Sequence, residues 1–150
     1  MDPIVNAIDG VLLTPLKVIE TDKGAVYHAM KNTDHGFSSF GEAYFSHVTT
    51  GVVKGWKKHT RMTLNIVVPV GEIKFVMYDD RNGSSTNGKF HSLTLSLDNY
   101  QRLTVPPGIW MAFQGVGPDK NLLLNLASIP HDPDEAVNLV LEQAHFKYSW

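Results

Sequence analysis

The sequence predicts an all-β fold, and two kinds of observation support this. Short segments with alternating apolar and polar residues recur along the chain, as in SLTLSL at 92–97. Turn signals rich in glycine and proline separate these segments, for example TDKG at 21–24 and PPG at 106–108. About eight short strands with regular turns are typical of a sandwich or barrel, with jelly-roll topology among the main candidates.

The expected strands follow in order, at 11–19, 25–30, 42–50, the two halves of 51–81, 92–97, 103–105, 109–113 and 121–127. Pro15 is expected near an edge or bend, because proline has no N–H to donate to a ladder. The one helix signal lies near the end, where Asp132 is a candidate cap, Pro133 suits the first position, and Asp134 and Glu135 suit a helix N-terminus. We therefore expect a β-fold followed by a short helical or irregular segment.

The composition excludes several classes of protein. At 150 residues we expect one domain, 1–150, and a net charge of −2 gives no basic field for nucleic acid or acidic membranes. The chain has no cysteine, which excludes disulfides, thiolate metal sites and cysteine nucleophiles. No apolar run approaches the roughly 18 residues needed to span a bilayer, and the N-terminal MDPIVNAIDG does not resemble a signal peptide. A cytoplasmic protein without membrane contact is expected.

The stretch from Gly51 to Arg81 contains the main candidates for catalytic and binding residues. Basic residues and one histidine crowd its first half, GVVKGWKKHTR. If this half is extended, Lys57, His59 and Arg61 share one face, because side chains alternate along a strand. A histidine between two cations on a rigid strand suits anion binding and proton transfer.

Three segments together resemble the dTDP-4-dehydrorhamnose 3,5-epimerase family, a branch of the cupin superfamily: GVVKGWKKH at 51–59, VGEIKFVMYDDRNGSSTNGKF at 70–90 and NYQRLTVPPGIWMAF at 99–113. TDKG at 21–24 is similar to the family's Asp-Arg-Gly turn, and the final YSW to its closing Tyr-Asp-Trp. The resemblance implies a cupin jelly-roll β-barrel, usually a homodimer, that acts on a nucleotide-linked 4-keto-6-deoxy sugar without metal or other cofactor.

The chain departs from the family's motifs at the reacting residues. Lys54 stands in place of the arginine and Lys57 in place of the histidine of Arg-Gly-Leu-His, and Met111 replaces a further histidine. The segment 127–130 has no tyrosine where the family has its acid. The short sugar-nucleotide 3,4-ketoisomerases are also similar. Their two strand histidines would fall at Lys57 and His59, and their Pro-Pro-Gly-Leu-Trp and Leu-Ala-Ser segments match 106–110 and 126–128.

The resemblance makes His59 the candidate base, which removes the proton α to the C4 ketone. Lys57 is a candidate to stabilise the enolate, or to be a base itself. Tyr44 and Tyr78 are the candidates for the missing acid. Because only one histidine remains of the metal-binding cupin pattern, no metal site is expected.

Other residues are candidates for substrate binding. Lys23 and Lys54 stand where the family places phosphate-binding arginines, and Arg61 is a second cation for the enolate. Asn65 shares the parity of His59 and is a candidate for a sugar hydroxyl or ketone. The remaining candidates are Arg102, Trp110, which can stack on a base or sugar, and Met111. Arg81 is expected to hold the 80–88 loop by an ion pair.

The resemblance therefore implies an isomerase of deoxysugar and cell-surface polysaccharide biosynthesis, an epimerase acting at C3, C5 or both. A 3,4-ketoisomerase and a sugar-nucleotide-binding cupin without activity are the alternatives. dTDP is the expected nucleotide, and the sequence leaves GDP, UDP and CDP open.

Overall fold

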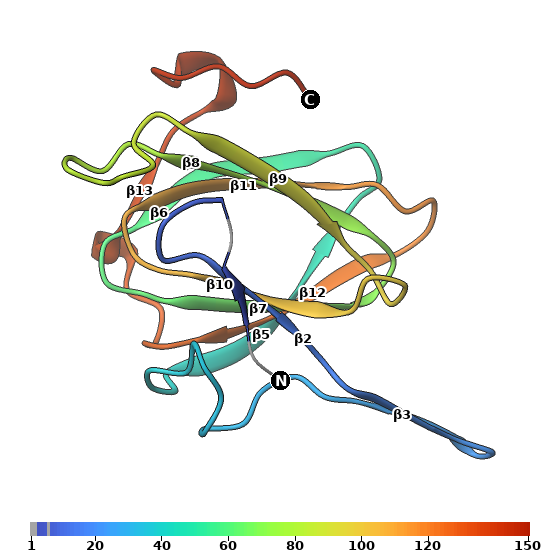
Figure 1. Cartoon of the computed structure of the whole chain (residues 1–150). Coiled ribbons are helices and arrows are strands. Elements are labelled where there is room, and N and C mark those ends of the chain that lie inside the picture. The colour runs from blue at the N-terminus through green and yellow to red at the C-terminus, as the bar shows by residue number, and fades with distance from the viewer. Residues whose placement is uncertain (1–2, 6) are drawn as a thin grey trace.

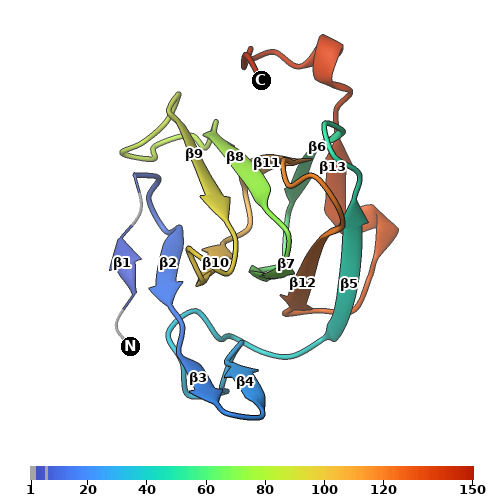
Figure 2. The same ribbon diagram turned by 90° about the vertical axis from the view of Figure 1, so that its right-hand side faces the viewer.

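The computed structural model describes residues 3–5 and 7–150. Its larger sheet has six antiparallel strands (Figures 1 and 2). Their order is β1 (Ile4–Val5), β2 (Leu12–Pro15), β10 (Gln101–Val105), β7 (Leu64–Val70), β12 (Asn121–Ala127) and β5 (Glu42–Val48). Apart from β1 and β2, the paired strands of this sheet are far apart in sequence, which is the pattern of a jelly roll.

The second sheet has five antiparallel strands and packs against the first. Their order is β13 (Ala136–Asn138), β6 (Val53–His59), β11 (Ile109–Gly115), β8 (Ile73–Asp79) and β9 (Phe90–Leu95). Strands β3 (Val18–Thr21) and β4 (Gly24–Tyr27) form a separate hairpin that projects from the body (Figure 1). The predicted all-β jelly-roll fold is confirmed.

Alternation along the strands builds the core between the sheets. Ile73, Phe75 and Met77 of β8 point inward and are fully buried, and Ile66 and Leu103 meet them from the six-stranded sheet. Such a continuous apolar interior is the main source of stability in a domain of this size.

Two local expectations need correction. The stretch 51–81 contains three strands, β6, β7 and β8, instead of two. The stretch 11–19 is not one strand: β2 ends at Pro15, and the chain then enters the β3–β4 hairpin in another sheet. The predicted cap at Asp132 is confirmed, since its side chain accepts a hydrogen bond from the Asp134 N–H at 3.0 Å. It starts only a single 3-10 turn, η1 (Pro133–Glu135), which β13 and a second turn, η2 (Leu141–Gln143), follow. The described chain contains no helix long enough to cross a membrane.

The C-terminal segment covers the outer face of the five-stranded sheet (Figure 1). Phe146 packs edge-on against Trp56 of β6, with ring centroids 4.9 Å apart, and stacks on Tyr78 of β8 at 4.2 Å. Trp110 of β11 lies in the same cluster, and its indole N–H donates to Asp80 at 2.7 Å. This aromatic cluster gives the five-stranded sheet a second apolar layer.

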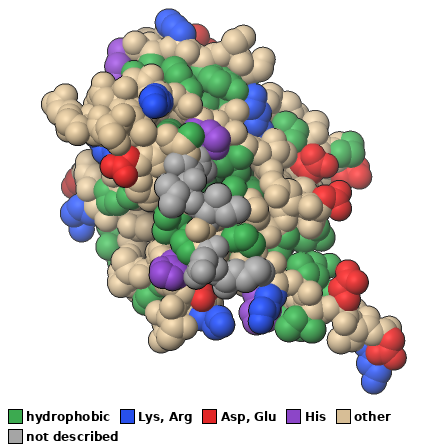
Figure 3. Space-filling model, viewed as in Figure 1, with side chains coloured by type: hydrophobic (Ala, Val, Ile, Leu, Met, Phe, Trp, Pro, Cys, Tyr) green, Lys and Arg blue, Asp and Glu red, His purple; other side chains and the backbone are tan. Residues whose placement is uncertain are grey.

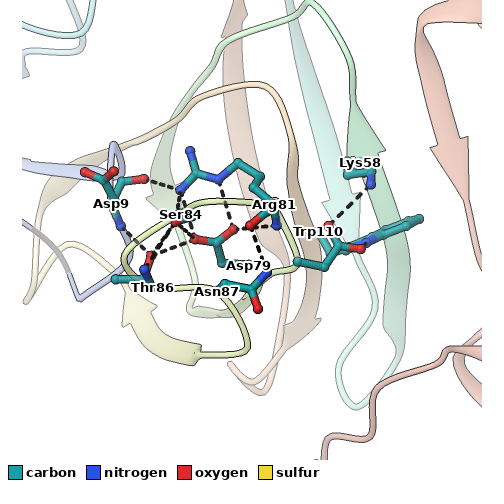
Figure 4. A network of polar contacts seen from close by, with 9 residues as sticks. Asp9, Lys58, Asp79, Arg81, Ser84, Thr86, Asn87 and Trp110 are labelled. Atoms are coloured by element: carbon teal, nitrogen blue, oxygen red, sulfur yellow. Dashed lines mark hydrogen bonds and ion pairs between the residues drawn. The ribbon is translucent and has the colours of Figure 1, made fainter.

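The loop after β8 is held by a buried carboxylate (Figure 4). Arg81 forms the expected ion pair, and its partner is the fully buried Asp79, at 2.9 Å. Ser84 and Thr86 each donate to the same carboxylate at 2.6 Å. Burial alone would raise the pKa of Asp79, but the hydrogen bonds from Arg81, Ser84 and Thr86 outweigh it and hold that pKa well below its usual value of 3.8.

Asp79→Asn is expected to destabilise the protein by about 3 kcal/mol at pH 7, because it removes the charge that neutralises Arg81 and satisfies two hydroxyls. A carboxyl group with a lowered folded-state pKa stabilises the fold above its unfolded pKa, and this contribution is lost as the pH falls. The difference between wild type and variant should therefore shrink between pH 5 and pH 3. Urea unfolding at each pH measures it, and a difference that grows on acidification would contradict this role.

Candidate functional site

A cavity of about 530 Å³ lies between the two sheets, next to their edge strands β5 and β13. Its volume falls within the range of about 300–1,000 Å³ that is usual for small-molecule sites. The interior is apolar, with Leu64 and Ile66 from β7, Met111 and Phe113 from β11, and Leu123 from β12. The polar groups on its walls therefore stand out as candidates for chemistry.

Strand β6 supplies three of these groups, Lys54, Lys57 and His59. Lys57 and His59 share a face through simple alternation, as predicted. Lys54 joins them because β6 bulges: Lys57 pairs with Met111, whereas Lys54 pairs with Phe113, so one extra β6 residue lies between the pairs.

Gly55 permits this bulge. Its φ is +145°, a backbone conformation that residues other than glycine rarely adopt. A Cβ at this position would also collide with Ala112 on β11. The glycine thus brings the lysine of the preceding position into the cavity.

His59 is held by a buried carboxylate from the C-terminal segment. Its Nδ1 hydrogen-bonds to Glu135 Oε1, and the two side chains are 12% and 2% exposed. The other oxygen, Oε2, accepts from the backbone N–H groups of Arg61 and Met62, both at 3.2 Å. The Glu135 carboxyl is therefore fixed from two sides at the end of β6.

Burial alone would raise the pKa of Glu135, but the hydrogen bonds from His59, Arg61 and Met62 outweigh it and lower that pKa below the usual value. Glu135 is thus ionised at neutral pH, and its carboxylate accepts a hydrogen bond from the N–H group of His59. In the neutral imidazole, this contact places the hydrogen on Nδ1 and leaves the lone pair of Nε2 free. A neutral histidine oriented in this way is equipped to act as a general base.

Tyr44 lies on the opposite wall. It belongs to β5 and pairs in register with Asn125 of β12. Asn125 Nδ2 donates to the phenol oxygen of Tyr44 at 3.0 Å. A phenol is thus present on the six-stranded sheet, while the histidine is on the five-stranded one.

The charges that line the cavity are positive. Lys54 Nζ donates to the carbonyl of His47 at 2.8 Å, which holds it near β5. Among the described residues, Lys57 has neither an ion-pair partner nor a hydrogen bond from its ammonium group. No carboxylate belongs to the described lining. Such a site favours an anionic ligand or an oxyanion.

Of the residues singled out in the sequence, the structure brings His59, Lys57, Tyr44, Lys54 and Met111 to the cavity. It does not bring Tyr78 and Trp110 there. Tyr78 does have the opposite parity to the core residues of β8, as predicted, but that face lies under the C-terminal aromatic cluster.

Four more candidates also lie outside the cavity lining. Arg61 follows β6 and pairs with Asp132 at 2.7 Å on the surface. Asn65 donates to the Gly36 carbonyl and accepts from Thr104, on the outer face of β7. Asn65 and His59 are an even number of residues apart, but they do not share a face, because the turn 60–63 carries the chain from the five-stranded sheet into the six-stranded one.

Arg102 is the largest fully buried side chain, and it too faces away from the cavity. Its guanidinium donates to the carbonyls of Ala29 and His35 and pairs with Asp34 at 3.2 Å, so it holds the 28–36 loop on the six-stranded sheet. Lys23 lies at the turn of the projecting hairpin. Neither residue contacts the cavity of its own chain.

Sequence reasoning missed Glu135, Asn125, Ser46 and Asn138, which either line the cavity or orient a residue in it. Asn125 did carry a signal, since it is polar at an inward position of the apolar strand NLLLNLA. Glu135 carried none, because its partner lies 76 residues away. Within residues 3–5 and 7–150, no three His, Asp or Glu side chains gather in a way that could hold a metal ion.

Comparisons with known proteins agree with this architecture. A family model described as dTDP-4-dehydrorhamnose 3,5-epimerase matches residues 6–150. The solved structure of a dTDP sugar isomerase from Desulfovibrio desulfuricans G20 is 37% identical, with a TM-score of 0.93 over 98% of this chain and 94% of that chain.

Two curated relatives are also similar. Agl13 of Haloferax volcanii, a probable low-salt glycan biosynthesis epimerase, is 32% identical over 97 residues, and the match spans 62% of each chain. The match to Agl13 thus covers less than two thirds of that relative's length. SpsL of Bacillus subtilis, a spore coat polysaccharide biosynthesis protein, is 25% identical over 128 residues, or 85% of each chain.

Proposed function

Since the chain belongs to the dTDP-4-dehydrorhamnose 3,5-epimerase family, we propose that it epimerises a nucleotide-linked 4-keto-6-deoxy sugar at C3, C5 or both. The observation that supports the proposal is that an imidazole and a phenol lie on opposite walls of one cavity. His59 stands on the five-stranded sheet, and Tyr44 on the six-stranded sheet. A sugar ring bound between them loses a proton from one face and regains one on the other, which inverts the carbon.

The chemistry needs no group beyond these side chains. His59 Nε2 takes the α-proton, and the C–H electron pair becomes the enolate double bond while negative charge moves to O4. The free ammonium of Lys57 stabilises that oxyanion. Tyr44 then donates its phenolic proton to the opposite face of the carbon. Proton exchange with water returns the imidazolium and the phenolate to their starting states.

The walls also support the substrate class. Lys54 provides a cation for a diphosphate, as a point charge. The names of the relatives add a pathway class, because Agl13 and SpsL serve glycan and spore coat polysaccharide biosynthesis. We propose dTDP as the nucleotide, a cell-surface polysaccharide as the end product and the cytoplasm as the compartment, where activated sugars are made.

We propose that the active form is a homodimer. The β3–β4 hairpin projects from the body with all eight of its strand residues exposed, and charged side chains lie at its tip (Figure 3). It also exposes four large apolar side chains, at 37–56%: Val18, Ile19, Val26 and Tyr27. Exposed apolar surface of this kind marks an interface. A second copy would cover it and place Lys23 of one protomer next to its partner.

Val26→Glu is expected to dissociate this dimer, because it puts a charge on the apolar hairpin without touching the core. Analytical ultracentrifugation should give twice 16.7 kDa for the wild type and 16.7 kDa for the variant. Val116→Glu, at an exposed loop on the body, is the matched control and should remain dimeric. A monomeric wild type, or a variant that still dimerises, would refute the arrangement.

The reaction class is tested by NMR analysis of the product from dTDP-4-keto-6-deoxyglucose. A 4-keto product with inverted C3 or C5 supports the proposal. A 3-keto product would show a ketoisomerase instead. Binding of the nucleotide sugar without any conversion, with dTDP, UDP, GDP and CDP forms alike, would show a binding protein that has lost its chemistry.

A further inference from the structure

The amide of Asn125 is unusual for its surroundings. Every second residue of β12 points inward, and Leu123, Asn125 and Ala127 are three of these residues. Asn125 is only 2% exposed. A buried carboxamide costs free energy unless its polar atoms are hydrogen-bonded. An apolar residue would fill the same position at lower cost, so the amide calls for a specific role.

The contacts of Asn125 fix its orientation. Its Oδ1 accepts from the backbone N–H of Asn65 on β7 at 3.2 Å. A main-chain N–H can only donate, so the carbonyl oxygen of the amide must face it. The NH₂ group then faces the phenol oxygen of Tyr44, 3.0 Å away. The backbone N–H of Asn65 on β7 thus determines that the NH₂ group of Asn125, and not its carbonyl oxygen, faces the Tyr44 phenol.

This orientation also fixes the role of the phenol. Because Nδ2 can only donate, Tyr44 accepts that hydrogen bond and its own O–H hydrogen points elsewhere. The donor stabilises the negative charge that grows on the phenol oxygen as its proton leaves. Resting on the proposed function, we infer that Asn125 is a positioning residue, which directs the Tyr44 proton toward the substrate and makes this phenol the acid.

Asn125→Asp tests the inference with an almost isosteric change. The carboxylate still accepts a hydrogen bond from the Asn65 N–H, but it also accepts one from the Tyr44 O–H and so turns that hydrogen toward residue 125 instead of the substrate. Formation of the inverted product should fall by about 10²-fold, the scale of one preorganised donor or acid. Exchange of the α-proton with heavy water should stay within about threefold, since His59 and Lys57 carry that step. Asn125→Leu should give the same selective loss if the aspartate variant folds poorly.

The control combines Asn125→Asp with Tyr44→Phe. If Asn125 acts through Tyr44, the double variant should be no slower than Tyr44→Phe alone, whereas a purely structural role would add its own loss.

A readout without turnover completes the test. In protein labelled with ¹³Cζ-tyrosine, Asn125→Asp should move the Tyr44 resonance, identified by its absence in Tyr44→Phe, and leave the other four tyrosines in place. An unmoved Tyr44 resonance, or equal losses of exchange and inversion, would overturn the inference. If the wild-type protein exchanges no α-proton, the proposed function is overturned instead. The Tyr44 resonance then still shows whether Asn125 contacts the phenol.

Discussion

His59→Gln is expected to slow α-proton exchange by about 10²–10⁴-fold, the usual contribution of a positioned general base. Glutamine can still donate to the buried Glu135 carboxylate, so the change removes the basic nitrogen and keeps the support of η1. The protein should therefore remain folded and bind nucleotide sugar. Exchange of substrate protons with heavy water, followed by proton NMR, measures the effect.

His47→Gln is the control for this change. His47 is exposed on β5 and lies outside the cavity lining, although its carbonyl holds Lys54. A side-chain change at this position should leave exchange near the wild-type rate. Full exchange in His59→Gln would remove His59 as the base and leave Lys57 as the other candidate.

Tyr44→Phe is expected to separate the two halves of the reaction. Inversion should fall by about 10²–10³-fold, since the acid on the opposite face is lost. Recovered substrate should still gain deuterium, because His59 can return a solvent deuteron to the face from which it took the proton. Separate integration of substrate and product signals in one heavy-water reaction gives both rates.

Tyr78→Phe is the matched control, because Tyr78 is the other tyrosine that the sequence proposed as the acid. Its ring stacks on Phe146 outside the cavity, so loss of its hydroxyl should leave both rates unchanged. If Tyr78→Phe loses inversion and Tyr44→Phe does not, the assignment of the acid is wrong.

The fold could be predicted from the sequence because its signals are local. Period-two patterns such as that of Ile73, Phe75 and Met77 identify a half-buried strand wherever it lies in the sheet. The same alternation correctly placed Lys57 and His59 on one face, since both belong to β6. Local patterns also gave the Asp132 cap and the short helical segment that follows it.

Relations between different strands could not be predicted in this way. Asn65 and His59 share a parity, yet they face different spaces because a turn separates their sheets. Tyr78 faces away from the core as expected, but only the distant C-terminal segment decides that aromatic rings, not a ligand, cover that face. Glu135 reaches His59 from 76 residues away. Strand order and long-range pairing set these contacts, and neither is visible in the spacing of one sequence.

The most direct test of the central claim, proton transfer across the cavity, is one NMR measurement on the wild-type protein. It is incubated with dTDP-4-keto-6-deoxyglucose in heavy water until product forms. We expect every inverted carbon, C3, C5 or both, to carry one solvent deuterium, while the ketone stays at C4. A product inverted without deuterium, or a bound substrate that never exchanges an α-proton, would contradict removal by His59 on one face and return by Tyr44 on the other.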